Sequence, residues 1–276
     1  MINKLRDIVE KTKSTPVMPV LFVGHGSPMN AIEDNPFSRK WKELGTELPR
    51  PSAILCISAH WETNGTFVTA MPVPETIHDF GGFPCELFKV QYPASGDTVL
   101  AKTIKDEIRE YPIGLNQDWG LDHGSWSVLR HIYPHADIPV LELSIDYTRS
   151  MQYHYDLAKE LAFLRRKGVL IVGSGNMVHN LRLVHVKSID GFNEPYGYDW
   201  ALEMNDIFKE KIKTGDHKAL INYPTLSKAA KLAIPTPDHY IPLLYALSLQ
   251  EADEEVSFFN DQALAGSLTM TSVIIR

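Results

Sequence analysis

Cysteine is scarce in this sequence, and a surplus of positive charge is missing. The 276 residues include two cysteines, Cys56 and Cys85, and neither belongs to a CxxC pair. A disulfide framework or a zinc ribbon is therefore not expected. The chain has 27 lysines and arginines against 34 aspartates and glutamates, a formal net charge of -7. This balance argues against a surface that neutralises nucleic-acid phosphates.

Long apolar runs are also missing. No stretch approaches the roughly 20 apolar residues that cross a bilayer. Residues 1–16 are polar and charged and contain no apolar signal-peptide core. We therefore expect a cytoplasmic protein with no membrane partner. Because no repeat, low-complexity tract or linker divides the sequence, we expect a single domain over residues 1–276.

Several local catalytic motifs do not occur. Neither Ser27 nor Ser174 stands in a GxSxG motif, which argues against a serine hydrolase. The stretch 173–176, Gly-Ser-Gly-Asn, matches neither GxGxxG nor GxxxxGK[ST], so a phosphate-binding loop is not indicated.

Apolar runs and helical periodicity alternate along the chain, which indicates the α/β class. We expect a three-layer fold in which helices flank a mostly parallel central sheet. The expected strands are 20–23, 53–59, 66–71, 139–145, 169–172, 256–259 and 267–275. The expected helices are 2–13, 38–46, 97–110, 128–133, 148–167, 198–214, 218–222, 226–232 and 242–250.

Histidines follow the ends of predicted strands. His25, His60 and His179 each come after one, and His239 lies in the proline-rich stretch 234–240, just before a helix. Ligands of α/β sheets bind beyond the carboxyl ends of the strands. Imidazole suits zinc, iron, copper and nickel, and three protein ligands with one open position are typical of a catalytic metal site. The four histidines therefore predict one metal centre at this edge.

Two irregular stretches accompany these histidines. Residues 73–93 are rich in proline, glycine and aromatic residues and include Phe80, and residues 116–127 contain His123. Long irregular segments within a compact domain are often functional. The histidines expected to lie outside the site are His131, His135, His154, His185 and His217.

Five blocks together resemble the class III extradiol ring-cleaving dioxygenases, and most closely the 4,5-DOPA dioxygenase type. They are GHGSP at 24–28, SAHWE at 58–62, DHGSW at 122–126, GSGNMVHN at 173–180 and PTPDHY at 235–240. The resemblance covers almost the whole chain, and the blocks occur in the family's order. One departure is that His239 stands where related extradiol enzymes have glutamate.

The resemblance implies a set of site residues. His25, His60 and His239 would hold the metal, with His179 close by as a fourth ligand or as the acid/base. His123 would be a second catalytic histidine that faces substrate or oxygen. The metal for turnover would be Fe(II), with Zn(II) also bound by members of this group. The residues expected to contact the substrate are Ser27, Phe80 and Tyr240.

The implied activity is that of an oxidoreductase, which opens the ring of a DOPA-like catechol with O2 and yields a muconic semialdehyde. Two alternatives use the same residues. A zinc hydrolase would activate a histidine-bound water, with Glu62 as a base. A binding protein would keep the fold without turnover.

Overall fold

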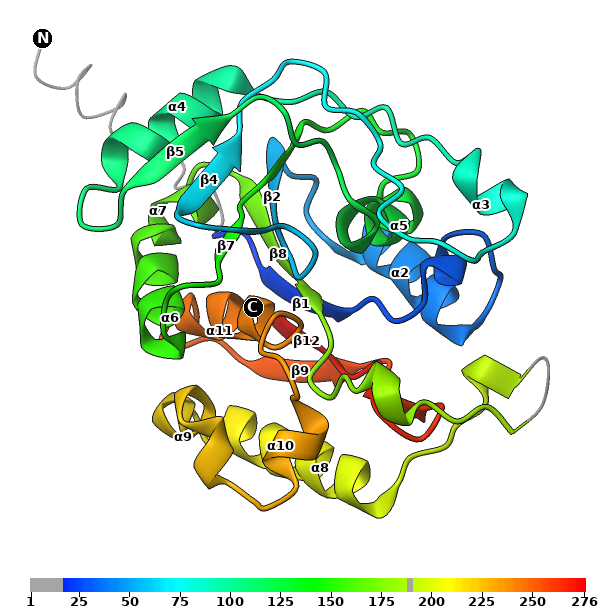
Figure 1. The fold of residues 1–276 in the computed structure, drawn as a ribbon. Coiled ribbons are helices and arrows are strands. Elements are labelled where there is room, and N and C mark those ends of the chain that lie inside the picture. Colours follow the sequence, from blue (N-terminus) through cyan, green and yellow to red (C-terminus); the bar gives the residue numbers. More distant parts are fainter. Residues whose placement is uncertain (1–16, 188–190) are drawn as a thin grey trace, which may run out of the picture.

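The structure is a computed structural model that describes residues 17–187 and 191–276. The helix expected over 2–13 lies outside the described residues. A six-stranded sheet of order β6-β2-β8-β1-β12-β9 forms the centre (Figure 1). Its strands are β1 (Val20–Gly24), β2 (Ala53–Ser58), β6 (Val140–Glu142), β8 (Val169–Gly175), β9 (Val256–Phe259) and β12 (Ser272–Ile275).

Short strands pair outside this sheet, and helices connect the strands. The outer pairs are β3 (Glu62–Thr63) with β7 (Ile145–Asp146), β4 (Thr66–Thr69) with β5 (Ile113–Asn116), and β10 (Ala263–Leu264) with β11 (Leu268–Thr269). The α-helices are α2 (Pro36–Glu47), α3 (Cys85–Phe88), α4 (Thr98–Glu107), α5 (His123–Ile132), α6 (Met151–Glu160), α7 (Ala162–Arg165), α8 (Asp199–Lys213), α9 (His217–Ile221), α10 (Ala230–Ala233) and α11 (Ile241–Ser248). The 3-10 helices are η1 (Pro28–Ala31), η2 (Leu181–Leu183), η3 (Gly191–Asn193) and η4 (Tyr223–Thr225).

The sheet is mostly parallel, as expected. Strands β6, β2, β8 and β1 are parallel neighbours, and β12 and β9 add an antiparallel edge. Strands β1, β2 and β8 are buried along their whole length. Burial on both faces explains their continuous apolar runs, because a strand with one wet face would alternate apolar and polar residues.

Two apolar cores lie on opposite faces of the sheet. In β1, Val20 and Phe22 pack into the core shared with α4, α6 and α11, whereas Leu21 and Val23 pack into the core shared with α2 and α5. Successive side chains of a strand point to opposite faces, so one apolar strand serves both cores. Figure 1 shows the resulting helix–sheet–helix layers.

The register of the parallel strands aligns the carboxyl ends of β1, β2 and β8. Gly24 of β1 pairs with Gly175 of β8, and Ser58 of β2 pairs with Ser174. His25 follows Gly24 directly, and His60 comes two residues after Ser58. Pairing therefore brings these two histidines to one edge of the sheet, although they are distant in sequence.

Most expected elements are present, with changed bounds. The expected strand 256–259 is confirmed as β9, and Asp97 is confirmed as the N-cap of α4, where its carboxylate accepts hydrogen bonds from the backbone of Val99 and Leu100. Gly168 adopts a left-handed φ of 79° just after α7, the conformation that glycine favours past a helix end.

Some expected bounds were wrong. The helix expected over 128–133 begins at His123, because Asp122 caps it and accepts a hydrogen bond from the backbone N–H of Ser125. The helix expected over 148–167 divides into α6 and α7. The strands expected over 139–145 and 267–275 each divide into two short strands. None of the helices within the described ranges is both long and apolar enough to span a membrane.

Candidate metal centre

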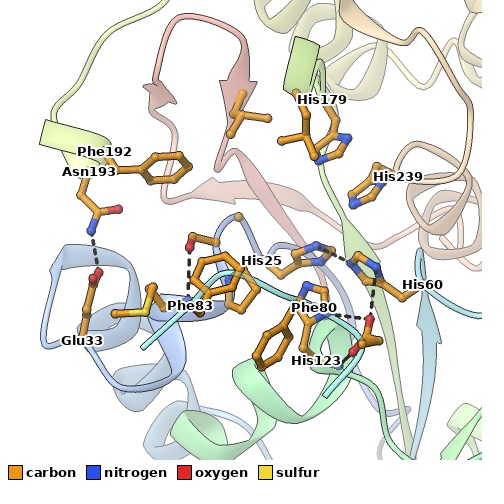
Figure 2. Close-up of a pocket in the computed structure, with 17 residues that line it drawn as sticks. His25, Glu33, His60, Phe80, Phe83, His123, His179, Phe192, Asn193 and His239 are labelled. Carbon is orange, nitrogen blue, oxygen red and sulfur yellow. Dashed lines mark hydrogen bonds and ion pairs between the residues drawn. The ribbon is translucent and has the colours of Figure 1, made fainter. Parts of the chain in front are cut away.

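A cavity of about 490 Å³ opens at the carboxyl edge of the sheet. Five histidines line it: His25, His60, His123, His179 and His239. Figure 2 shows these imidazoles gathered at one end of the cavity, with Phe80 and Phe83 beside them and Glu33 and Asn193 at the other end. The structure thus brings together the four histidines expected at a metal and the fifth expected nearby.

The rings of His25, His60 and His239 are almost equally spaced. Their centroids are 5.0 Å apart for His25 and His60, 5.3 Å for His25 and His239, and 5.0 Å for His60 and His239. Imidazoles that surround one ion at tetrahedral angles have centroids roughly 5 Å apart, given metal–nitrogen bonds of about 2.0–2.1 Å. The spacing of these three rings therefore suits a shared ion.

His123 offers an alternative third ligand. Nitrogens of His25, His60 and His123 all lie within 4.8 Å of one another, and so do ligand atoms of His179, Asp238 and His239. The His123 ring lies 3.9 Å from that of His60 but 5.5 Å from that of His25, so its spacing is less even than that of His239.

The tautomer of His25 follows from its hydrogen bonds. Its Nδ1 lies 3.0 Å from Ser174 Oγ, and that hydroxyl donates its only proton to the Gly124 carbonyl at 2.5 Å. Ser174 must therefore accept from Nδ1–H of His25. A neutral imidazole protonated at Nδ1 presents a bare lone pair at Nε2, which leaves the Nε2 of His25 free to bind a metal.

Asp79 serves both His60 and His123. Its Oδ2 lies 2.8 Å from Nδ1 of His123 and 3.4 Å from Nδ1 of His60, while its Oδ1 accepts from the backbone N–H of His123 at 2.9 Å. Burial alone would raise the pKa of Asp79, but the side-chain and backbone hydrogen bonds from His123 and the charge of that ring together outweigh burial, and the pKa is lowered. The ionised carboxylate only accepts, so it favours Nδ1–H and a free Nε2 on both rings.

His239 is oriented in the same way by its neighbour. Its Nδ1 hydrogen-bonds to the carboxylate of Asp238. Burial opposes ionisation of Asp238, but this bond, the charge of His239 and a hydrogen bond from Thr236 together outweigh burial and lower the pKa of the carboxyl. The loop that carries His239 lies directly on β8, where a Cβ added to Gly175 would come within 2.1 Å of the His239 carbonyl oxygen. Only glycine allows this approach.

The Nε2 atoms of His25 and His60 lie 3.1 Å apart. Both rings carry their proton at Nδ1, so two lone pairs face each other, an arrangement that a cation between them stabilises. Two imidazole nitrogens that bind one ion at about 2.0–2.1 Å are themselves roughly 3 Å apart. Burial, and then the charge of neighbouring histidines, hold the pKa of His25 and of His60 well below the usual value. Both rings are therefore neutral ligands at neutral pH, and the donor set fits a metal.

His179 packs flat against His239, with ring centroids 3.5 Å apart and planes 8° apart. Within the described residues its ring nitrogens have no hydrogen-bond partner, whereas its backbone N–H donates to Ala233. Burial, reinforced by His239, lowers the pKa of His179 to about 3. The imidazole is thus neutral at neutral pH, and its ring nitrogens can hydrogen-bond to a bound molecule.

A buried carboxyl pair lies beneath the histidines. Ser58 donates to Asp122 Oδ1 at 2.6 Å, and the backbone N–H of Asp122 donates to Glu142 at 2.9 Å. Burial, with repulsion between the two groups, raises the pKa of Glu142 well above its usual value. Ser125 also hydrogen-bonds to Glu142. This network fixes the start of α5, and with it the position of His123.

Of the three residues expected to contact substrate, two lie at the cavity and one does not. Ser27 and Phe80 line the cavity. Tyr240 does not: its side chain is fully buried, and its hydroxyl donates to the Leu220 carbonyl at 3.0 Å. The expectation for Tyr240 is therefore wrong, because the ring packs into the core beside Phe208 and Tyr223. Glu62 is exposed and does not line the cavity either.

Several residues of the site were not found by sequence reasoning. Asp79, Glu33, Phe192 and Asn193 all line the cavity. Asp79 carried a usable signal, since it is an acidic residue directly beside Phe80 in the irregular stretch 73–93. Glu33 and Asn193 carried none, because nothing local relates positions 33 and 193.

Comparison with known proteins identifies relatives along the full length of the chain. Residues 18–271 match the model of the family described as the catalytic LigB subunit of aromatic ring-opening dioxygenase. A protein of Escherichia coli (strain K12) named 4,5-DOPA dioxygenase extradiol is 44% identical over 279 residues, which cover 100% of both chains. A protein of the same name from Beta vulgaris is 36% identical and covers 84% of this chain and 86% of its own length.

A solved structure has the same fold. The crystal structure of an uncharacterised Escherichia coli K12 protein superposes with a TM-score of 0.81 at 40% sequence identity. The match covers 94% of this chain and 100% of the other. The helix–sheet–helix arrangement that carries the histidine cluster is thus also that of an experimentally determined relative.

Proposed function

The chain belongs to the family of the catalytic LigB subunit of aromatic ring-opening dioxygenases, and from this premise we propose that it cleaves a DOPA-like catechol with O2 to a muconic semialdehyde. It is a metal-dependent extradiol dioxygenase. The observation that carries the proposal is the 3.1 Å separation of the Nε2 atoms of His25 and His60. Their lone pairs converge beside an apolar cavity that accommodates an aromatic ring.

We propose that His25, His60 and His239 hold the metal through Nε2. The even spacing of their rings supports this set over one that includes His123. Each Nδ1 is engaged by a different neighbour: Ser174, Asp79 and Asp238 respectively. Such neighbours fix the ring orientation and raise the basicity of the ligand nitrogen. Fe(II) is the proposed metal of turnover, and Zn(II) is a second metal that the same nitrogens accommodate.

When bound, the metal supplies the Lewis-acidic, redox-active centre that brings catechol and O2 together. His179 takes a proton from a catechol hydroxyl, since its neutral ring nitrogens face the cavity without a partner. His123, held at Nδ1 by Asp79, presents its other ring nitrogen to the cavity and shuttles a proton there. Both are general acid–base roles, which positioned histidines most often supply in enzymes.

Aromatic side chains keep water away from the reacting ring. Phe80 packs edge-on against His123 at 5.5 Å and against Phe83 at 5.5 Å between ring centroids. Both rings line the cavity on the side of the aromatic stretch 73–93. A water-poor site strengthens the electrostatic interactions that position the substrate and limits side reactions.

The test is turnover after anaerobic loading. Protein stripped of metal is loaded with Fe(II) under nitrogen, then mixed with O2 and a panel of catechols that includes DOPA. We expect uptake of O2 and a yellow ring-opened product, and neither with Zn(II)-loaded protein. No O2 uptake and no product across the panel would contradict the proposal. Hydrolysis of amides or esters by the zinc form, without O2 uptake, would instead support the hydrolase alternative.

A further inference from the structure

Glu33 and Asn193 form a polar wall at the end of the cavity away from the histidines (Figure 2). Glu33 lies between η1 and α2, and Asn193 ends η3. The Asn193 amide donates to Glu33 Oε2 at 2.8 Å, and the Asn35 amide donates to the same oxygen at 3.3 Å. Two elements distant in sequence thus hold the Glu33 carboxylate in place. We call Glu33 and Asn193 the acceptor pair.

The acceptor pair has oxygens without donors. Glu33 Oε1 has no hydrogen bond or ion pair within residues 17–187 and 191–276, although Oε2 has two. Asn193 Oδ1 is buried and also has no hydrogen-bond partner there. Buried polar atoms in native proteins are normally paired, and an exception calls for an explanation such as a bound ligand. Two neighbouring acceptors, one of them charged, call for a cationic donor.

No cation of the described chain answers this need. The described lining of the cavity contains no lysine or arginine. Its other carboxylate, Asp79, is already engaged by His60 and His123. The region between the histidines and the acceptor pair is lined by apolar side chains, among them Phe83 and Phe192. The cavity therefore runs from imidazoles, through apolar walls, to a carboxylate that has no cationic partner among the described residues.

We propose that the acceptor pair binds the ammonium group of a substrate whose catechol ring lies at the histidines. This rests on the proposed function and narrows its substrate class to catechols with a protonated amine on a short alkyl side chain. An ammonium has three N–H donors, and two of them match Glu33 Oε1 and Asn193 Oδ1. Charge-assisted hydrogen bonds of this kind are stronger than neutral ones. A carboxylate at the same place would meet Glu33 and be repelled.

Three matched probes test the subsite: 4-(2-aminoethyl)catechol, its neutral isostere 4-propylcatechol, and the anion 3-(3,4-dihydroxyphenyl)propanoate. The measurement is kcat/KM by O2 uptake with the Fe(II)-loaded protein. We expect the amine to exceed the neutral probe by about tenfold, and the anion to be the poorest substrate. Higher salt reduces this preference, because charge attraction is screened.

Two variants test whether the charge of the Glu33 carboxylate causes the preference for the amine, or whether loss of any nearby carboxylate charge has the same effect. Glu33→Gln keeps the shape of the side chain and removes its charge, and we expect the amine-to-neutral ratio of kcat/KM to fall by about tenfold. Asp34→Asn is the matched control, since Asp34 pairs with Arg39 and does not line the cavity. Its amine-to-neutral ratio stays at the wild-type value.

The outcomes distinguish the subsite from the reaction. Equal kcat/KM for the amine and the neutral probe in the wild type would overturn the subsite and leave ring cleavage standing. The same follows if Glu33→Gln folds and keeps the wild-type ratio. If neither DOPA nor any of the three probes is opened, the proposed function fails. Calorimetric binding of the same probes under nitrogen then decides the subsite, with tighter binding of the amine supporting it and equal binding overturning it.

Discussion

Ser174 accepts a hydrogen bond from Nδ1 of His25 across 3.0 Å and donates its own proton to the carbonyl oxygen of Gly124. The hydroxyl is fully buried between these two partners, and because the carbonyl oxygen can only accept, the proton points to Gly124. This relationship fixes the tautomer of His25 and thereby the nitrogen that faces the cavity. A serine on β8 thus prepares His25, the proposed metal ligand that follows β1, and the first prediction follows from this relationship.

Ser174→Ala removes this control of the tautomer. We expect metal affinity to fall by about 10–100-fold, the usual effect of losing a partner behind a metal-binding histidine. Competition with a chelator of known affinity measures the change. Ser227→Ala is the control, because Ser227 does not line the cavity and its hydroxyl donates to the exposed Glu203. Unchanged affinity in Ser174→Ala would show that the hydroxyl does not prepare His25.

The choice of third ligand is tested by comparing His239→Gln with His123→Gln. We expect His239→Gln to lose most of its bound metal, because the even triangle of imidazoles is broken. His123→Gln keeps its metal but loses about 10²–10⁴-fold in kcat, the range for an acid–base group. Metal per chain is measured by mass spectrometry after reconstitution. The reverse pattern would assign the third ligand to His123.

Gly175→Ala tests the close approach of the His239 loop to β8. The added Cβ would come within 2.1 Å of the His239 carbonyl oxygen. The loop must move, so we expect a loss of about 1–3 kcal/mol in the free energy of unfolding together with weaker metal binding. Denaturant unfolding and metal titration measure the two effects. Gly81→Ala is the control for stability, since no atom lies within 4 Å of its Cβ.

His154 lies outside the metal site and makes the stability of the fold depend on pH. It is fully buried, its Nδ1 lies 3.1 Å from the Tyr245 hydroxyl, and burial lowers its pKa from 6.5 to about 4. The unfolded chain therefore binds a proton at a higher pH than the folded chain. Stability is complete above pH 6.5 and falls as the pH drops toward 4, by about 3 kcal/mol for this group.

His154→Asn removes this titration and keeps a polar group near the Tyr245 hydroxyl. We expect its free energy of unfolding to fall less than that of the wild type between pH 6.5 and 4. Other buried histidines contribute equally to both proteins, so the difference between the two pH profiles isolates His154. Denaturant unfolding at several pH values measures it. Parallel profiles would mean that His154 titrates normally in the folded protein.

Local signals in the sequence determined much of the layout. Continuous apolar runs predicted β1, β2 and β8, because strands buried on both faces have no wet side to mark with polar residues. Histidines directly after these runs predicted a site at the carboxyl edge. Bounds were less well predicted where a side chain overrides the pattern, as Asp122 does when it caps α5 five residues earlier than expected.

The sequence by itself determined the α/β class, the edge of the sheet that carries the site and the histidines that gather there, because apolar periodicity and strand ends are local properties of the chain. The tertiary structure alone decided what surrounds them. It placed Asp79 behind two histidines, brought Asn193 to Glu33, and buried Tyr240 in the core instead of the cavity. These relationships depend on how distant segments pack against one another, and the spacing of residues along the chain does not reveal this packing.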